Sequence, residues 1–197
     1  KEQKIAVEHQ NGPLLVLSGA GTGKTRVLTS RFVYIVKKLN VDFHKIIAVT
    51  FTNKAANEIK DRVNKELKQN IDSPWIGTFH SIFAKFLRKY SHIVKLKNNF
   101  NILDIDDQKK LIKQVIQYCK IENDVNENIY LNEIQNLKDQ KILPEEKTKI
   151  SKYSSIEHIT DIYELYQDRL IEINGVDFGD ILLHSYKILL NNDEIRK

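Results

Sequence analysis

The chain has 197 residues, of which 41% are hydrophobic and 29% charged, and its net charge at pH 7 is +5. These values are typical of a soluble globular protein with one or two domains, and the positive charge is compatible with a polyanionic partner without requiring one. A single cysteine excludes an internal disulfide framework, and no stretch approaches the roughly 18 consecutive apolar residues of a membrane span. No signal peptide opens the chain, so we expect a cytoplasmic protein; since Met is absent, we expect its natural start to differ from Lys1.

The first part of the chain alternates short apolar runs with helical patterns. Runs rich in Leu, Ile and Val predict buried strands over 14–17, 45–50 and 75–78. Apolar residues at helical spacing predict helices between and after these runs, over 23–39, from Asn53 as N-cap to about 67, and over 80–90. Alternating strands and helices predict a parallel sheet with crossover helices, and therefore an α/β fold.

From about residue 89 onward the pattern is helical. Apolar residues recur at helical spacing over 106–119, 130–139 and 156–173. Cys119 lies on the apolar side of the first of these helices, so we interpret it as a core residue rather than a reactive thiol. We expect Asp177 to begin a last helix that runs to about Leu190, with Asp180 completing a capping box.

A glycine-rich loop, "SGAGTGKT" at residues 18–25, follows the first predicted strand and opens a predicted helix. Small residues let backbone N–H groups approach phosphate oxygens closely, and the helix N-terminus adds a positive partial charge. Lys24 supplies an ammonium for the β- and γ-phosphates and Thr25 a hydroxyl ligand for Mg²⁺. The strict pattern G-x-x-x-x-G-K-[ST] has glycine at the position of Ser18. The loop predicts a nucleotide site, with a glycine-rich turn that holds no ligand as the alternative; its residues are Ser18, Gly19, Ala20, Gly21, Thr22, Gly23, Lys24 and Thr25.

Two further patterns resemble nucleotide-site motifs but fit them poorly. "TNKAAN" at 52–57 is similar to the guanine-reading N-K-x-D pattern, but Ala56 replaces the required carboxylate. "FNILDIDDQ" at 100–108 is similar to a strand followed by metal-binding acids, including Asp104. Its apolar run is short, and we interpret Asp106 and Asp107 as the start of a helix, which favours negative charge.

Four segments in order carry a resemblance to the UvrD/Rep/PcrA helicases of superfamily 1. "EQKIAVEHQNGPLLVLSGAGTGKTRVLTSR", "IIAVTFTNKAANEIKDRV" and "IGTFHSIFAKFLRK" look like the family's first motifs, and "VDFGDILL" resembles a segment that leads towards its second motor motif. The resemblance implies part of a RecA-like ATP-binding domain, 1A, over 1–88. It also implies an inserted all-helical domain, 1B, over 89–174 and a helix that returns to domain 1A over 175–197.

The resemblance also assigns roles to single residues. Gln3 matches a glutamine that reads the adenine edge, and Arg26 matches an arginine that packs on the adenine face; Lys24 and Thr25 become catalytic residues, with ATP and Mg²⁺ as cofactors. A single-stranded DNA path is implied, with Phe51 and Phe79 as base platforms and with backbone contacts from Thr52, Asn53, Thr78 and His80. From the pattern alone, both phenylalanines would be assigned to the core.

A basic stretch supports a nucleic-acid partner independently. Residues 75–103 contain no acidic residue, and cations alternate there with aromatic residues, a combination typical of single-strand binding. A solvated basic helix face is the alternative. The residues concerned are Lys85, Arg88, Lys89, Lys95, Lys97, Phe83, Phe86 and Tyr90.

Taken as a helicase, the protein would be a 3′-to-5′ ATP-driven translocase that acts on single-stranded DNA and on junctions of single and double strands. The sequence does not identify its repair or replication partners. The family's acidic D-E-x-Q-D motif and second motor domain would follow Lys197, so we expect the chain alone to bind nucleotide without hydrolysing it. The alternatives are a compact kinase with a phosphate-binding loop, which would need an arginine-rich lid, and a non-catalytic nucleic-acid-binding module.

Overall fold

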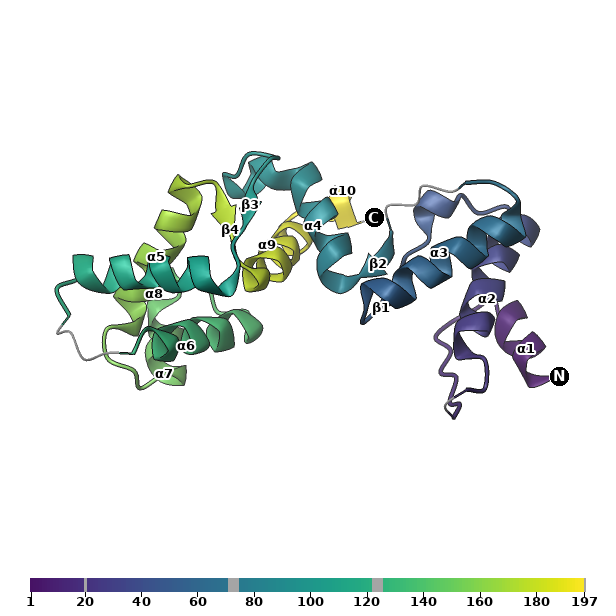
Figure 1. Ribbon diagram of the computed structural model, residues 1–197, viewed down its shortest axis with the longest axis horizontal. Helices are drawn as coiled ribbons and strands as arrows, with labels where there is room; N and C mark the ends of the chain where they lie inside the picture. The colour runs from purple at the N-terminus through teal and green to yellow at the C-terminus, as the bar shows by residue number, and fades with distance from the viewer. Residues whose placement is uncertain (20, 71–74, 122–125, 197) are drawn as a thin grey trace. The chain divides into compact units, whose positions relative to one another are not determined.

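A computed structural model describes residues 1–19, 21–70, 75–121 and 126–196, and it divides the chain into two compact units, Lys1–Ile82 and Phe83–Lys197 (Figure 1). The unit boundary falls within helix α4, Phe79–Tyr90. The fold mixes helices with small parallel sheets. Within the described residues, no helix is both long enough and apolar enough to cross a membrane. The predicted domain boundaries after residues 88 and 174 stay predictions.

The first unit is built around one parallel strand–helix–strand element. Strand β1 pairs in parallel with β2, in the register Ala48↔Ile76 to Thr50↔Thr78, and α3 connects them. Its core joins residues of α2, α3 and both strands: Phe32, Ala48, Ile59, Val63, Leu67 and Ile76. The elements before α4 are α1 (Glu2–Glu8), α2 (Lys24–Lys38), η1 (Phe43–Lys45), β1 (Ala48–Thr50), α3 (Asn53–Leu67) and β2 (Ile76–Thr78).

The predicted strand over 14–17 is wrong. This segment has no strand structure, and Leu15 and Leu17 are 81% and 85% exposed. A strand forms only where a neighbour takes up its backbone hydrogen bonds. In the described part of the chain, β1 and β2 pair only with each other, so the sheet has two strands where three were predicted. The predicted cap of α3 is wrong by one residue, because the Thr52 hydroxyl accepts the Ala55 N–H at 3.2 Å and Asn53 already belongs to the helix.

The second unit is a helical bundle with one short sheet. Helix α6 packs against α5, α8 and α9 around a core that includes the fully buried Tyr163 and Tyr166. Cys119 packs at the edge of this core, which confirms its interpretation, and burial raises the pKa of its thiol. The elements are η2 (Ser91–Val94), β3 (Asn101–Ile102), α5 (Ile105–Tyr118), α6 (Glu127–Asp139), α7 (Lys147–Tyr153), α8 (Ile159–Glu172), β4 (Gly175–Val176), α9 (Phe178–Asn191) and α10 (Asp193–Arg196).

The expectation of an all-helical second part is wrong in one detail. Strands β3 and β4 pair in parallel, with Asn101 opposite Gly175, and so join segments far apart in sequence. Two-residue strands are too short to show an alternating pattern, which is why the sequence did not predict them. Asp106 and Asp107 lie in the first turn of α5, as interpreted, and the N-cap is Asp104, whose carboxylate accepts the Asp107 N–H at 2.9 Å.

A buried charge cluster joins three helices of the second unit. The Lys138 ammonium of α6 lies 2.6 Å from an oxygen of Asp177 and 2.7 Å from one of Asp180. The two aspartates form the predicted capping box of α9, and Tyr166 and Gln167 of α8 donate hydrogen bonds to them at 3.1 Å. We call these five residues the Lys138 cluster.

The charges in the Lys138 cluster determine each other's protonation. Burial disfavours the Lys138 ammonium, but Asp180 and Asp177 more than offset this effect and raise its pKa. Burial likewise disfavours the Asp180 carboxylate, and Lys138 more than offsets it, so the pKa of Asp180 is lowered. Burial and the neighbouring Asp180 instead raise the pKa of Asp177, so Lys138 and Asp180 form the charged ionic contact inside the bundle.

Candidate nucleotide and nucleic-acid site

The glycine-rich loop folds back around the ammonium of Lys24. Gly21 and Gly23 adopt φ values of +75° and +89°, a left-handed conformation that is strained for residues with a side chain. Gly23 is the N-cap of α2, which makes Lys24 the first residue of the helix. The Lys24 ammonium donates to the carbonyls of Ser18 at 3.0 Å and Gly19 at 2.7 Å. The positive charge thus lies at the centre of the loop, as a phosphate site requires; Ala20 lies outside the described residues.

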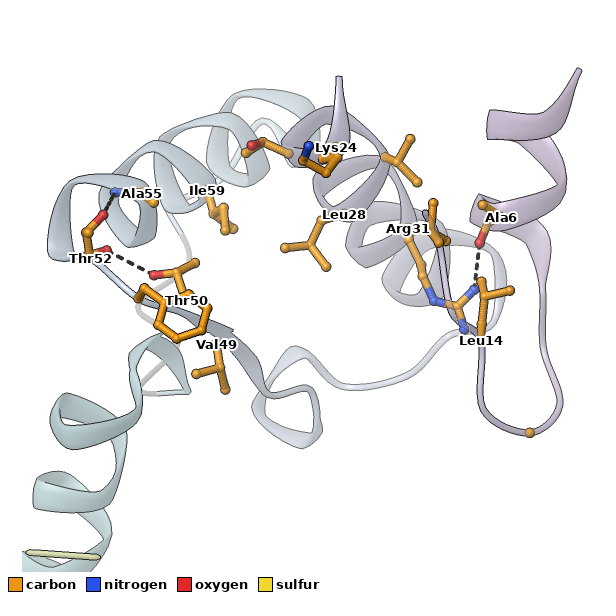
Figure 2. A pocket seen from close by; sticks show the side chains of 15 residues that line it. Ala6, Leu14, Lys24, Leu28, Arg31, Val49, Thr50, Thr52, Ala55 and Ile59 are labelled. Carbon is orange, nitrogen blue, oxygen red and sulfur yellow. Dashed lines mark hydrogen bonds between the residues drawn. The ribbon is translucent and has the colours of Figure 1, made fainter. Parts of the chain in front are cut away.

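A cavity of about 720 Å³ in the first unit connects the glycine-rich loop with the residues that follow β1 (Figure 2). Lys24 and Thr25 line it from α2, and Phe51 and Thr52 line it from the end of β1. The remaining lining is largely apolar and includes Leu14, Val16, Val27, Leu28, Val49 and Ile59. One concave surface therefore joins a predicted phosphate site to part of the predicted DNA path.

The two residues predicted to contact the base lie beside the glycine-rich loop. The side-chain amide of Gln3 donates to the Thr22 carbonyl at 3.1 Å. A Cβ atom added at Gly23 would lie 3.7 Å from that amide nitrogen and 3.9 Å from the Cβ of Arg26. Arg26 is exposed on the first turn of α2. The fold thus brings Gln3, Arg26 and the loop to one place, although 19 positions separate Gln3 from Thr22.

The two phenylalanines of the predicted DNA path are surface residues. Phe51 is 96% exposed and Phe79 is 50% exposed, so the assignment to the core, which the pattern alone favoured, is wrong. Thr50 and Thr78 are opposite each other at the carboxyl ends of the two parallel strands. Phe51 and Phe79 follow them directly, so both lie at the same end of the sheet.

The polar residues predicted along the DNA path lie beside the phenylalanines but differ in exposure. Thr52, Asn53 and His80 are exposed. Thr78 is half-buried, and its hydroxyl accepts the Ser81 N–H at 3.3 Å. The edge of the sheet therefore combines two exposed aromatic rings with polar groups.

The basic stretch is partly used for folding. Arg88 donates to the carbonyls of Asn98 at 2.9 Å and Phe100 at 3.1 Å, and its guanidinium carbon lies 4.3 Å from the centre of the Phe100 ring. Phe86 is buried. A loop of the second unit and its core thus already engage these two residues, and their contact with DNA stays a prediction. Lys89, Lys95 and Lys97 are exposed.

Sequence reasoning missed Arg31, which lies one turn after Leu28 on α2 and lines the same cavity. Its guanidinium donates to three carbonyls at the end of α1, those of Ala6, Val7 and His9. Figure 2 shows the guanidinium pointing towards Ala6. The sequence signal that could have identified Arg31 is its position on the apolar side of the α2 pattern, where a charged residue is unexpected.

Comparison with known proteins shows which family the chain belongs to. Residues 1–197 match the UvrD/REP helicase N-terminal domain. The chain belongs to the UvrD/REP helicase family.

Several relatives in this family align over nearly the whole chain. The chain is 40% identical to DNA helicase II of Rickettsia typhi, over 100% of the chain and 30% of that protein. It is 37% identical to a probable DNA helicase II homolog of Mycoplasma capricolum, over 98% of the chain and 28% of that protein. The identity to the ATP-dependent DNA helicase PcrA of Staphylococcus aureus is 34%, over 98% of the chain and 27% of that protein. The chain therefore spans less than a third of these relatives.

Proposed function

We propose that this chain forms the part of an ATP-dependent 3′-to-5′ DNA helicase that binds ATP and Mg²⁺ and grips single-stranded DNA, including at junctions with double strands. The observation that carries the proposal is the glycine-rich loop curled around the Lys24 ammonium at the start of α2. The match of the whole chain to the UvrD/REP family and the helicase names of its relatives support it. In this proposal 1–88 and 175–197 belong to motor domain 1A, and 89–174 form domain 1B.

The residues of the loop fit a magnesium nucleotide. Lys24 exchanges its bonds to the Ser18 and Gly19 carbonyls for bonds to phosphate oxygens, which are stronger acceptors because they are charged. The Thr25 hydroxyl, next in the first turn of α2, is the group that would hold Mg²⁺ together with the phosphates. Gln3 and Arg26, which lie beside the same loop, are the residues that would contact the base.

Hydrolysis needs a carboxylate that orients water and cations that meet the charge developing on the γ-phosphate. The candidate acid Asp104 is instead the N-cap of α5, and the Asp107 carboxylate lies 3.1 Å from the Lys110 ammonium. Among the described residues, no group of three or more His, Cys, Asp and Glu side chains is arranged as a metal site. We therefore assign the hydrolytic acids and the second motor domain to the rest of the protein.

The cavity contains residues of both the proposed nucleotide site and the proposed DNA path. Lys24 and Thr25 of α2 line it, and so do Phe51 and Thr52, which follow β1. If the loop shifts when ATP binds or leaves, the shape of this surface changes, and the surface includes the proposed DNA-binding residues Phe51 and Thr52. Base stacking on an exposed ring such as Phe51 tolerates any sequence, which suits a protein that moves along DNA.

Replacing Phe51 or Phe79 by alanine is expected to weaken binding of a single-stranded oligonucleotide about 5- to 150-fold, since one stacked base contributes about 1–3 kcal/mol. The thermal midpoint should change little for Phe51→Ala, because the ring is 96% exposed. Fluorescence anisotropy of a labelled oligonucleotide, recorded beside a melting curve for each variant, separates affinity from stability.

Tyr153→Ala is the matched control, because Tyr153 is an aromatic residue of the second unit with 65% exposure and no proposed DNA contact. Its DNA affinity should equal that of the wild type. A lowered melting midpoint with unchanged DNA affinity in Phe51→Ala would contradict the proposed base platform.

A further inference from the structure

Helix α1 has little to hold it in place by itself. It has seven residues, its N-cap Lys1 makes no side-chain capping bond, and Ala6 is its one buried residue. Ile5, its largest apolar side chain, is 63% exposed. Helices this short are not stable alone in water, so the position of α1 depends on polar contacts with its neighbours.

Arg31 supplies the strongest of these contacts. The last carbonyls of a helix lack partners within the helix and carry a negative partial charge, which a cation offsets. One guanidinium nitrogen of Arg31 lies 3.0 Å from the Ala6 oxygen, 3.4 Å from that of Val7 and 2.6 Å from that of His9. Arg31 is half-buried, which limits competition from water.

The other end of α1 contacts the glycine-rich loop through Gln3, which donates to the Thr22 carbonyl at 3.1 Å. That bond uses one N–H of the amide, and a second N–H and the carbonyl oxygen belong to the same group. An amide with a donor and an acceptor side by side matches the edge of adenine, whose ring nitrogen N7 accepts and whose amino group donates. A 6-oxo purine has an acceptor in place of that amino group and does not match.

We propose that Arg31 is a positioning residue: it fixes α1 against α2 and so orients the Gln3 amide to hydrogen-bond a purine with a 6-amino group. The inference rests on the proposed function and deepens it, since the hydrogen bonds of Arg31 go to the end of α1 that lies away from Gln3. A lysine at this position keeps the charge, but its compact ammonium is more strongly hydrated than a guanidinium, so it replaces arginine only in part.

The test compares three ligands in the full-length protein: ATP, its 6-oxo analogue ITP, and inorganic triphosphate, which has no base. Gln3→Ala is expected to reduce the preference for ATP over ITP by roughly 5- to 150-fold, the range for one bidentate base contact. Arg31→Ala should reduce this preference to the same level, and Arg31→Lys should lie between. Arg31→Ala and Arg31→Lys should bind inorganic triphosphate within about twofold of the wild type, since the hydrogen bonds of Arg31 go to the end of α1 and not to the loop.

The Gln3→Ala, Arg31→Ala double variant gives the most direct test, because the effects of substituting two residues that act through one contact are not additive. Its preference should equal that of either single variant. Arg62→Ala is the control, because Arg62 is an exposed arginine of α3 whose side chain pairs with Glu58; its preference should be that of the wild type.

The inference is overturned if Arg31→Ala keeps the wild-type preference while Gln3→Ala loses it. It is also overturned if Arg31→Ala loses ATP and inorganic triphosphate in parallel, because Arg31 would then support the loop as a whole. Unchanged preference in Gln3→Ala overturns it as well and leaves the phosphate site intact. Failure of the wild type to bind any of the three ligands is the distinct result that removes the proposed function itself.

Discussion

Lys24→Ala is expected to weaken ATP binding about 10- to 150-fold. A charge-assisted hydrogen bond contributes about 1.5–3 kcal/mol, and the Lys24 ammonium lies at the centre of the glycine-rich loop, within 3.0 Å of two of its carbonyls. Its loss removes the cation that meets the phosphates. The melting midpoint should change little, because the side chain is exposed. Titration with a fluorescent ATP analogue measures the affinity.

Lys38→Ala is the matched control, because Lys38 is an exposed lysine in the last turn of the same helix. It should bind ATP as the wild type does. Equal affinity of the wild type and Lys24→Ala would contradict the assignment of the loop to phosphate binding.

Lys138→Met is expected to lower the free energy of unfolding of the second unit by about 3–5 kcal/mol, the usual cost of removing one partner from a buried ion pair. The methionine retains most of the volume of the lysine stem, so packing changes little. The loss arises because Asp177 and Asp180 then remain buried without the cation that lies 2.6 and 2.7 Å from them. Urea unfolding monitored by circular dichroism measures the effect.

Glu172→Ala provides the comparison for the Lys138 cluster. Glu172 also pairs with a cation, at 2.6 Å from Arg169, but both side chains are about half exposed. Exposed pairs contribute about 0–1 kcal/mol, so this variant should unfold near the wild-type midpoint. If both variants lost a similar free energy of unfolding, burial would not be the reason that the Lys138 cluster stabilises the second unit.

The features that could be predicted from the sequence are those that depend on nearby residues. Helices α2, α3, α5, α6 and α8 have apolar residues at helical spacing, and they form close to the predicted ranges. The capping box of α9 depends on Asp177 and Asp180, three residues apart, and it forms as predicted. The glycine-rich loop was also predicted, because its small residues are adjacent in sequence.

The features that could not be predicted depend on distant partners. The run at 14–17 is as apolar as a buried strand, but no strand of the described chain pairs with it. Phe51 resembles a core residue in sequence and is exposed, because none of the described residues of the first unit covers its ring. Lys138 appears in sequence as an ordinary helix lysine, and only the fold shows that two aspartates surround it.

The measurement that tests the proposed helicase role most directly is phosphate release from ATP, with and without single-stranded DNA. We expect the full-length protein to hydrolyse ATP and to be stimulated by DNA, and its Lys24→Ala variant to do neither. The 197-residue chain alone should release phosphate no faster than its own Lys24→Ala variant, because Lys24 and Thr25 hold substrate without an acid to activate water. Full-length protein that binds ATP but shows no hydrolysis with DNA would contradict the helicase proposal. DNA-stimulated hydrolysis by the 197-residue chain would contradict the assignment of the catalytic acids to the rest of the protein.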